Sequence, residues 1–101
     1  MLSVLVVDDD VTIRETLVDF FASLGHVARG AATATAGRQA AAEHSPDVAL
    51  VDLRLPDADG LRLLEALRAD DPELAVVFMT GHGDVATAVR AMREGAADFL
   101  E

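Results

Sequence analysis

The sequence predicts an α/β fold in which a parallel sheet is covered by helices on both faces. Short apolar runs alternate along the chain with segments of helical periodicity, the order expected of parallel strands joined by helical crossovers. The apolar runs are nearly continuous, as expected for strands buried on both faces. A chain of 101 residues with 51% hydrophobic residues can form one domain around one core.

Five segments are predicted strands. The first and third are rich in valine and leucine and end in aspartates, whereas the second is weakly apolar. The fourth is a continuous apolar run, and the fifth follows a glycine near the end of the chain. These strands are residues 2–7, 26–31, 48–53, 74–79 and 96–100.

The first predicted helix covers residues 11–24, where large apolar residues recur at helical spacing. Thr12 and Glu15 have the spacing of a capping box, which would start this helix. Gly25 then provides a residue suited to the left-handed turn that ends many helices.

Three further helices are predicted. Residues 33–44 are rich in alanine and stop before Pro46, and residues 61–70 carry regularly spaced leucines that we assign to the core. Asp84 is a suitable N-cap for the last helix, and Gly95 is a suitable stop. The predicted helices therefore alternate with the predicted strands along the whole chain.

Composition excludes several classes of function. The formal charge of −10 argues against direct binding of nucleic acid or of an anionic membrane by this segment. The absence of cysteine excludes disulfides, zinc–thiolate sites and a thiol nucleophile. No apolar run has the length of a membrane span and no signal peptide is evident, so we expect a cytoplasmic protein. All 8 basic residues are arginine.

Polar side chains follow three of the predicted strands. Asp8 and Asp9 follow the first, Asp52 lies at the end of the third, and Thr80 follows the fourth. Ligands of open α/β sheets bind beyond the carboxyl ends of the strands, so we expect these residues to form a site. Carboxylates favour Mg²⁺, and a carboxylate beside Mg²⁺ is a suitable nucleophile toward phosphorus, with a hydroxyl donating to a phosphoryl oxygen.

Each group also has an ordinary structural interpretation. Residues 8–10 could simply place negative charge at the start of a helix, and Asp52 could be a solvated strand end. The stretch 57–60 is similar to a calcium-binding loop, but Leu55 and Ala66 occupy positions where such a loop needs acids. We therefore reject the calcium loop, and the coincidence of acids at several strand ends favours a site.

The acids lie within longer stretches that match a known family: residues 6–10, 45–52, 55–61, 79–84 and 95–100. With these motifs the whole chain, residues 1–101, closely resembles the receiver domains of two-component response regulators. The resemblance implies a flavodoxin-like, doubly wound five-stranded parallel sheet of order 2-1-3-4-5. The stretches 81–84 and 98–101 are most similar to regulators of the nitrogen-control and nitrogen-fixation kinds.

The resemblance also implies roles for individual residues. Asp52 corresponds to the phosphoryl acceptor. Asp8 and Asp9 correspond to acids that bind Mg²⁺ together with Asp52, and the backbone carbonyl of Arg54 corresponds to a further ligand. Thr80 corresponds to the switch hydroxyl. Phe99 corresponds to the aromatic switch residue on the fifth strand.

Partners follow from the same resemblance. The phosphoryl donor would be a sensor histidine kinase, and the parent protein would carry an ATPase or helix-turn-helix output domain. The resemblance further implies that the receiver domain is not an enzyme with an external product, although it catalyses its own phosphorylation and dephosphorylation.

The end of the sequence departs from the family pattern. Receiver domains normally have a lysine after the fifth strand, then a proline and a last helix, whereas this sequence ends at Glu101, one position before that lysine. We therefore expect a truncated receiver domain that lacks the last helix and exposes apolar sheet surface. Low stability and self-association, as a homodimer or by segment exchange, would follow.

Two other classes remain as alternatives. Residues 8–12 also fit the D-x-D-x-T pattern of haloacid-dehalogenase-like phosphatases, in which Asp8 would be the nucleophile and Asp10 the acid/base. That interpretation gives Thr80 a role but leaves Asp52 unexplained, and such enzymes need a lysine. The other alternative is a phosphate-independent interaction module that keeps the fold without the switch.

Overall fold

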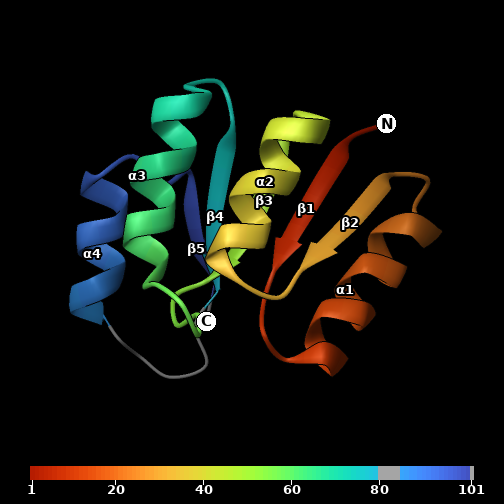
Figure 1. Cartoon of the computed structure of the whole chain (residues 1–101), viewed down its shortest axis with the longest axis horizontal. Helices are drawn as coiled ribbons and strands as arrows, with labels where there is room; N and C mark the ends of the chain where they lie inside the picture. Colours follow the sequence, from red (N-terminus) through yellow and green to blue (C-terminus); the bar gives the residue numbers. More distant parts are fainter. Residues whose placement is uncertain (80–84, 101) are drawn as a thin grey trace.

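The computed structural model contains one five-stranded parallel sheet with the strand order β2-β1-β3-β4-β5, and it describes residues 1–79 and 85–100 (Figure 1). The strands are β1 Ser3–Val7, β2 Val27–Ala31, β3 Val48–Asp52, β4 Ala75–Met79 and β5 Asp98–Leu100. The helices are α1 Val11–Ser23, α2 Ala34–His44, α3 Gly60–Asp70 and α4 Val85–Arg93.

The predicted fold class and strand order are confirmed. Strand β1 lies between β2 and β3, and every adjacent pair in the sheet is parallel. Observed strand boundaries fall within about two residues of the predicted ones; the ends differ mainly because Leu2, Leu53 and Leu74 lie outside the ladders. The described residues contain no helix after β5, and none of their helices has the length and apolarity needed to cross a membrane.

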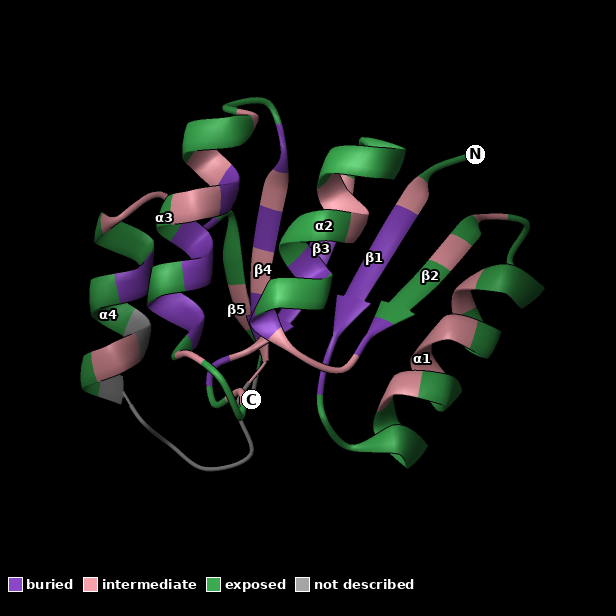
Figure 2. Cartoon of the chain, in the orientation of Figure 1, coloured by how far each residue is buried: buried purple, intermediate pink, exposed green. Residues whose placement is uncertain are grey.

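The two faces of the sheet are covered unequally. The larger core lies between one face and α2, α3 and α4, and its fully buried side chains include Phe78, Leu64 and Leu67. The smaller core is formed by Val4, Val6 and Leu50, and α1 packs over it. Figure 2 shows the difference, because α1 carries only intermediate and exposed residues whereas α3 has a buried face.

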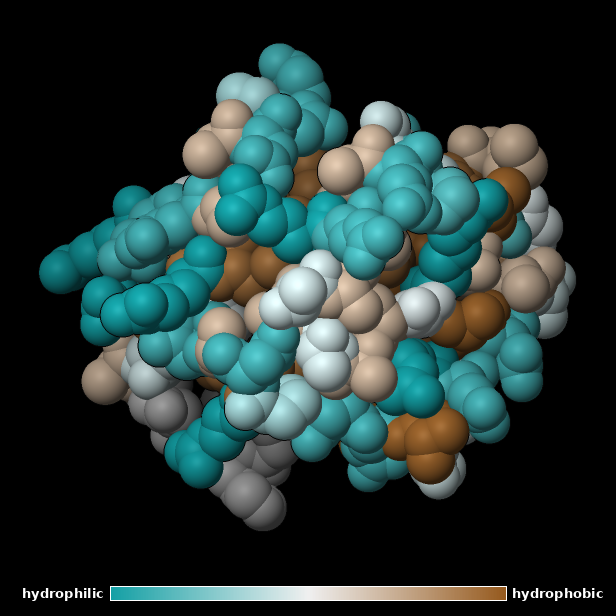
Figure 3. All heavy atoms as spheres, viewed as in Figure 1, coloured by the Kyte–Doolittle hydropathy of each residue, from teal (hydrophilic) through white to brown (hydrophobic). Residues whose placement is uncertain are grey.

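The leucines of α3 were correctly predicted to be core residues. Leu61, Leu63, Leu64 and Leu67 are all buried. Around them the outer surface of α2 and α3 is largely hydrophilic, with hydrophobic side chains visible between the two helices (Figure 3). The amphipathic pattern read from the sequence therefore marks the face that α3 turns to the sheet.

The predicted capping box of α1 is wrong. Asp10 is the N-cap, and its Oδ1 accepts hydrogen bonds from the backbone N–H groups of Thr12 (2.9 Å) and Ile13 (3.1 Å). An aspartate is a better cap than threonine, and Asp10 stands two positions earlier. Gly25 follows the helix with φ +88°, as predicted for a stop. The predicted cap Asp84 lies outside the described residues.

Gly60 allows α3 to begin close to the end of β3. A Cβ atom at this position would lie 2.9 Å from the Asp52 carbonyl oxygen and 2.9 Å from the Leu53 Cα. It would also lie 2.8 Å from the Phe78 ring. Two of these neighbours are backbone atoms, so they cannot move without displacing the strand end that carries Asp52.

We expect Gly60→Ala to lower the free energy of unfolding by about 1–3 kcal/mol, because the added methyl overpacks the junction of β3 and α3. Urea denaturation measures this change. Amide NMR shifts should also change from Asp52 to Arg54. Gly25→Ala is the control, since its positive φ makes alanine costly by about 1–2 kcal/mol while its Cβ would meet no atom within 4 Å. Unchanged amide positions at Asp52 in Gly60→Ala would contradict the prediction.

Candidate functional site

The carboxyl ends of β1 and β3 bring three acids together. Val7 pairs with Val51 in the parallel ladder, so the residues that follow them emerge side by side. One carboxylate oxygen from each of Asp8, Asp9 and Asp52 lies within 4.8 Å of the others. The predicted grouping of these three residues is therefore present in the structure.

Asp8 is the most buried member of this acidic cluster, with 4% of its surface exposed. Its Oδ1 accepts a hydrogen bond from the Asp10 backbone N–H at 2.9 Å. Burial raises the pKa of the Asp8 carboxyl above its usual value, and the negative charges of Asp52, Asp9 and Asp10 raise it further, while the Asp10 N–H opposes the shift. The site thus holds a carboxylate whose charge is poorly compensated by the protein alone.

Asp52 is the last residue of β3 and is partly exposed. Its Oδ1 accepts a hydrogen bond from the Arg54 backbone N–H at 3.1 Å. Arg54 in turn forms an isolated antiparallel bridge with Asp59, which closes the base of the loop between β3 and α3. This arrangement keeps the Asp52 carboxylate at the edge of the sheet, accessible from solvent.

Near β1, Asp10 has the role at the start of a helix that the sequence offered for residues 8–10, whereas Arg14 makes a contact that the sequence did not assign. The Asp10 carboxylate is engaged in capping α1, which counts against its assignment as the acid/base of a dehalogenase-like enzyme. Arg14 donates from Nη1 to the backbone carbonyl oxygen of Asp8 at 2.8 Å. The basic residue within helical reach of the aspartates was the available signal.

Asp57 was also missed. Its carboxylate accepts three hydrogen bonds from the first turn of α2: one from the Ala34 N–H and two from Thr35, through its N–H and its hydroxyl. Hydrogen bonds from Thr35, and then from Ala34, lower the pKa of Asp57 to about 2. The available signal was that α2 has no acid in its own first turn to complement the helix dipole.

The two predicted switch residues differ in what the structure describes. Thr80 lies outside the described residues. Phe99 lies on β5 beside Phe78 of β4, partly buried against the larger core. Phe99 therefore lies on the outermost strand β5, whereas the acids lie at the carboxyl ends of the inner strands β1 and β3.

The donor set fits a hard divalent cation. All three side chains of the acidic cluster provide carboxylate oxygens, which Mg²⁺ and Ca²⁺ prefer. Burial, and after it the neighbouring carboxylates, raises the pKa of Asp8, and a cation bound to the cluster would offset both effects. The exposed side of the site leaves room for water ligands, which Mg²⁺ usually retains.

Comparison with known proteins decides the family. The model of the response regulator receiver domain matches residues 4–101. This chain belongs to the receiver domain family. The domain is a signalling module of two-component response regulators and not a classical enzyme.

Individual relatives agree with this assignment. The receiver domain is 43% identical over 100 residues to the transcriptional regulatory protein FixJ of Azorhizobium caulinodans, which covers 99% of the chain and 47% of the relative. It aligns with the receiver domain of NtrX from Brucella abortus at a TM-score of 0.91 and 40% identity, which covers 97% and 83% of the two chains.

A third relative was solved with a modified residue and bound ligands. This response regulator from Burkholderia pseudomallei contains a phosphorylated aspartic acid, a calcium ion and citrate. It aligns at a TM-score of 0.92 and 29% identity over 99% of this chain and 59% of its own. The chain spans about half the length of curated relatives that it matches over nearly all of its own length.

The electrostatics of Asp8 generate a prediction. Its folded-state pKa is raised, so the folded protein binds more protons at this site than the unfolded chain, and stability falls as the pH rises through the folded-state pKa. We expect Asp8→Asn to raise the melting temperature at pH 7 by a few degrees in metal-free buffer, because the amide keeps the acceptor for the Asp10 N–H without the charge. Calorimetry measures this shift.

The matched control is Asp9→Asn, which removes a neighbouring charge from an exposed position. We expect a smaller rise for this variant. A lower melting temperature for Asp8→Asn than for the unaltered chain would mean that the buried carboxylate stabilises the fold, contrary to the prediction.

Proposed function

We propose that Asp52 accepts a phosphoryl group from a phosphohistidine of a sensor histidine kinase, in a reaction that requires Mg²⁺. The observation that carries this proposal is the cluster of Asp8, Asp9 and Asp52 at the carboxyl edge of a receiver-domain sheet. The phosphorylated aspartate and the divalent ion in the Burkholderia relative support it. Asp52 is the member that is accessible without being fully exposed.

In the proposed reaction all three acids would bind the metal, and Asp52 would also act as the nucleophile. The carboxylates of Asp8, Asp9 and Asp52 and the backbone carbonyl of Arg54 would hold Mg²⁺. When bound, the metal neutralises charge on the phosphoryl oxygens. An Asp52 oxygen bonds to phosphorus while the bond from phosphorus to the histidine nitrogen breaks, and its electron pair stays with the imidazole. The Arg54 N–H orients the Asp52 carboxylate through its hydrogen bond to Oδ1.

The proposed output is a conformational switch. The phosphoryl group adds negative charge and acceptor oxygens at the end of β3. The Thr80 hydroxyl would donate to one of these oxygens, and Phe99 would change its side-chain position on β5 in response. Both changes would bias α4 between two arrangements and so transmit the signal to an output domain.

Further parts of the proposal concern the whole protein. An ATPase or helix-turn-helix domain would provide the output, and the protein would work in the cytoplasm. We also propose self-association, as a homodimer or by segment exchange, because α1 is the one helix of the described residues that packs on the second face, and Leu100 is 49% exposed. Sedimentation of the chain as a monomer at all concentrations would contradict self-association.

The phosphoryl acceptor is tested with Asp52→Asn. We expect the unaltered chain to gain one phosphoryl group from phosphoramidate in the presence of Mg²⁺ and the variant to gain none, because the amide is not a nucleophile toward phosphorus. Intact-mass spectrometry measures the gain. With Mg²⁺ and beryllofluoride, a mimic of the aspartyl phosphate, amide NMR shifts should change around position 52 and α4 in the unaltered chain only.

The outcomes separate the candidate functions. Phosphorylation that persists in Asp52→Asn and disappears in Asp8→Asn would favour the dehalogenase-like alternative. A folded chain that responds to neither Mg²⁺ nor beryllofluoride would favour an interaction module that works without phosphate.

A further inference from the structure

Asp57, in the loop between β3 and α3, binds the first turn of α2 through its side chain. Its Oδ1 accepts a hydrogen bond from the Ala34 N–H at 2.8 Å. Its Oδ2 accepts from both the N–H (3.0 Å) and the hydroxyl (2.7 Å) of Thr35. The Thr33 hydroxyl accepts from the Ala36 N–H at 3.0 Å. Asp57, more than 20 residues away in the sequence, adds a negatively charged cap to the same end of α2.

The base of the same loop is fixed at the acidic cluster. The Gly60 N–H donates to the Leu53 carbonyl oxygen at 2.8 Å, and Arg54 forms its bridge with Asp59. Asp59 in turn accepts from the Arg62 N–H at 2.9 Å and caps α3. Residues 54–59 therefore form a short loop whose base adjoins Asp52 and in which the Asp57 side chain binds α2, while Leu55 and Ala58 pack against the larger core.

We propose that Asp57 is a positioning residue for the divalent cation: by attaching the β3–α3 loop to α2, it holds the Arg54 backbone carbonyl beside Asp52. This inference rests on the proposed function. Because this ligand is a backbone carbonyl, its direction is set by the backbone conformation of the loop and not by a side-chain rotamer. Residues that orient metal ligands in this way typically change affinity by about 10–100-fold when they are removed.

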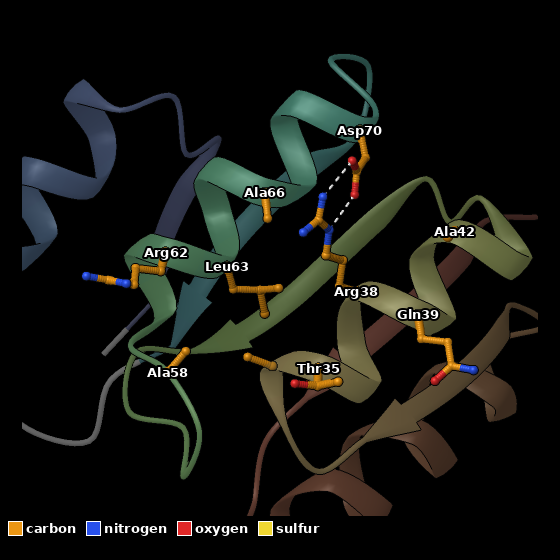
Figure 4. A pocket seen from close by; sticks show the side chains of 10 residues that line it. Thr35, Arg38, Gln39, Ala42, Ala58, Arg62, Leu63, Ala66 and Asp70 are labelled. Atoms are coloured by element: carbon orange, nitrogen blue, oxygen red, sulfur yellow. Dashed lines mark hydrogen bonds and ion pairs between the residues drawn. The ribbon is translucent and has the colours of Figure 1, made fainter.

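A second link to α2, this time from α3, offers a matched comparison. Arg38 of α2 binds Asp70 of α3 through two hydrogen bonds of 2.8 and 3.0 Å. Figure 4 shows this ion pair toward one end of a groove of about 470 Å³ between the helices, with Thr35 and Ala58 toward the other end. Both links involve exposed carboxylates, but only that of Asp57 connects to the loop that carries Arg54.

The experiment compares Asp57→Ala with Asp70→Ala in the complete chain. Isothermal titration calorimetry with MgCl₂ measures the dissociation constant. We expect Asp57→Ala to weaken Mg²⁺ binding by on the order of tenfold. We expect Asp70→Ala to bind Mg²⁺ as the unaltered chain does, because the hydrogen bonds of the Arg38–Asp70 pair join α2 to α3 and not to the loop. Phosphorylation of Asp57→Ala by phosphoramidate should recover at saturating Mg²⁺, which separates weaker metal binding from slower chemistry.

The other partner of the link gives an independent readout. Thr35→Val removes the hydroxyl donor but keeps the N–H, so we expect a smaller loss of Mg²⁺ affinity in the same direction. The Asp57→Ala/Thr35→Val double variant should bind Mg²⁺ no more weakly than Asp57→Ala alone, because the hydroxyl then has no carboxylate to bind. Amide hydrogen exchange should become faster at Ala34 and Thr35 in Asp57→Ala and stay unchanged in Asp70→Ala.

Three results would overturn the inference. Asp57→Ala that binds Mg²⁺ as tightly as the unaltered chain, while the α2 amides exchange faster, would restrict Asp57 to capping α2. Equal weakening by Asp70→Ala would assign the effect to general loosening of the two helices. An unaltered chain that does not bind Mg²⁺ would overturn the proposed function itself, and this inference with it.

Discussion

The concentration of negative charge at one edge of the sheet is the constraint on which the rest of the site depends. Parallel pairing places the ends of β1 and β3 side by side, so Asp8 and Asp52 stay close although their charges repel. The strands behind them are buried against α2 and α3, and that burial opposes the repulsion. The backbone N–H groups of Asp10 and Arg54 offset a further part. A bound cation would offset the remainder, which gives the unfavourable arrangement a functional reason.

The strands and helices were predictable because burial leaves a strong pattern in the sequence. Continuous apolar runs identified the strands, and the leucines of α3 identified its buried face. The strand order needed the family resemblance, since alternation alone allows several topologies. The start of α1 was placed on the wrong cap because Asp10 and Thr12 both have suitable side chains, and only the backbone geometry decides between them.

The acidic cluster was predictable for a different reason. Asp8, Asp9 and Asp52 each stand at or directly after a predicted strand, so the topology alone brings them to one edge. The sequence could not show that Asp57 caps α2, because the partners are more than 20 residues apart and their contact depends on how the β3–α3 loop lies. Local patterns describe caps within a helix, whereas this cap is supplied by tertiary structure.

The unequal cover of the sheet has a consequence for local unfolding. α1 is held by a small core and has no buried residue, whereas the other face is sealed by three helices. Segments with few buried contacts open at a lower free energy than the whole domain. When α1 opens, the Arg14 contact to the Asp8 carbonyl is lost, so the acidic cluster loses one of the contacts that hold it, although the sheet can persist. A cation that binds only the assembled cluster would therefore stabilise α1 selectively, and ligand occupancy would be coupled to the order of one helix.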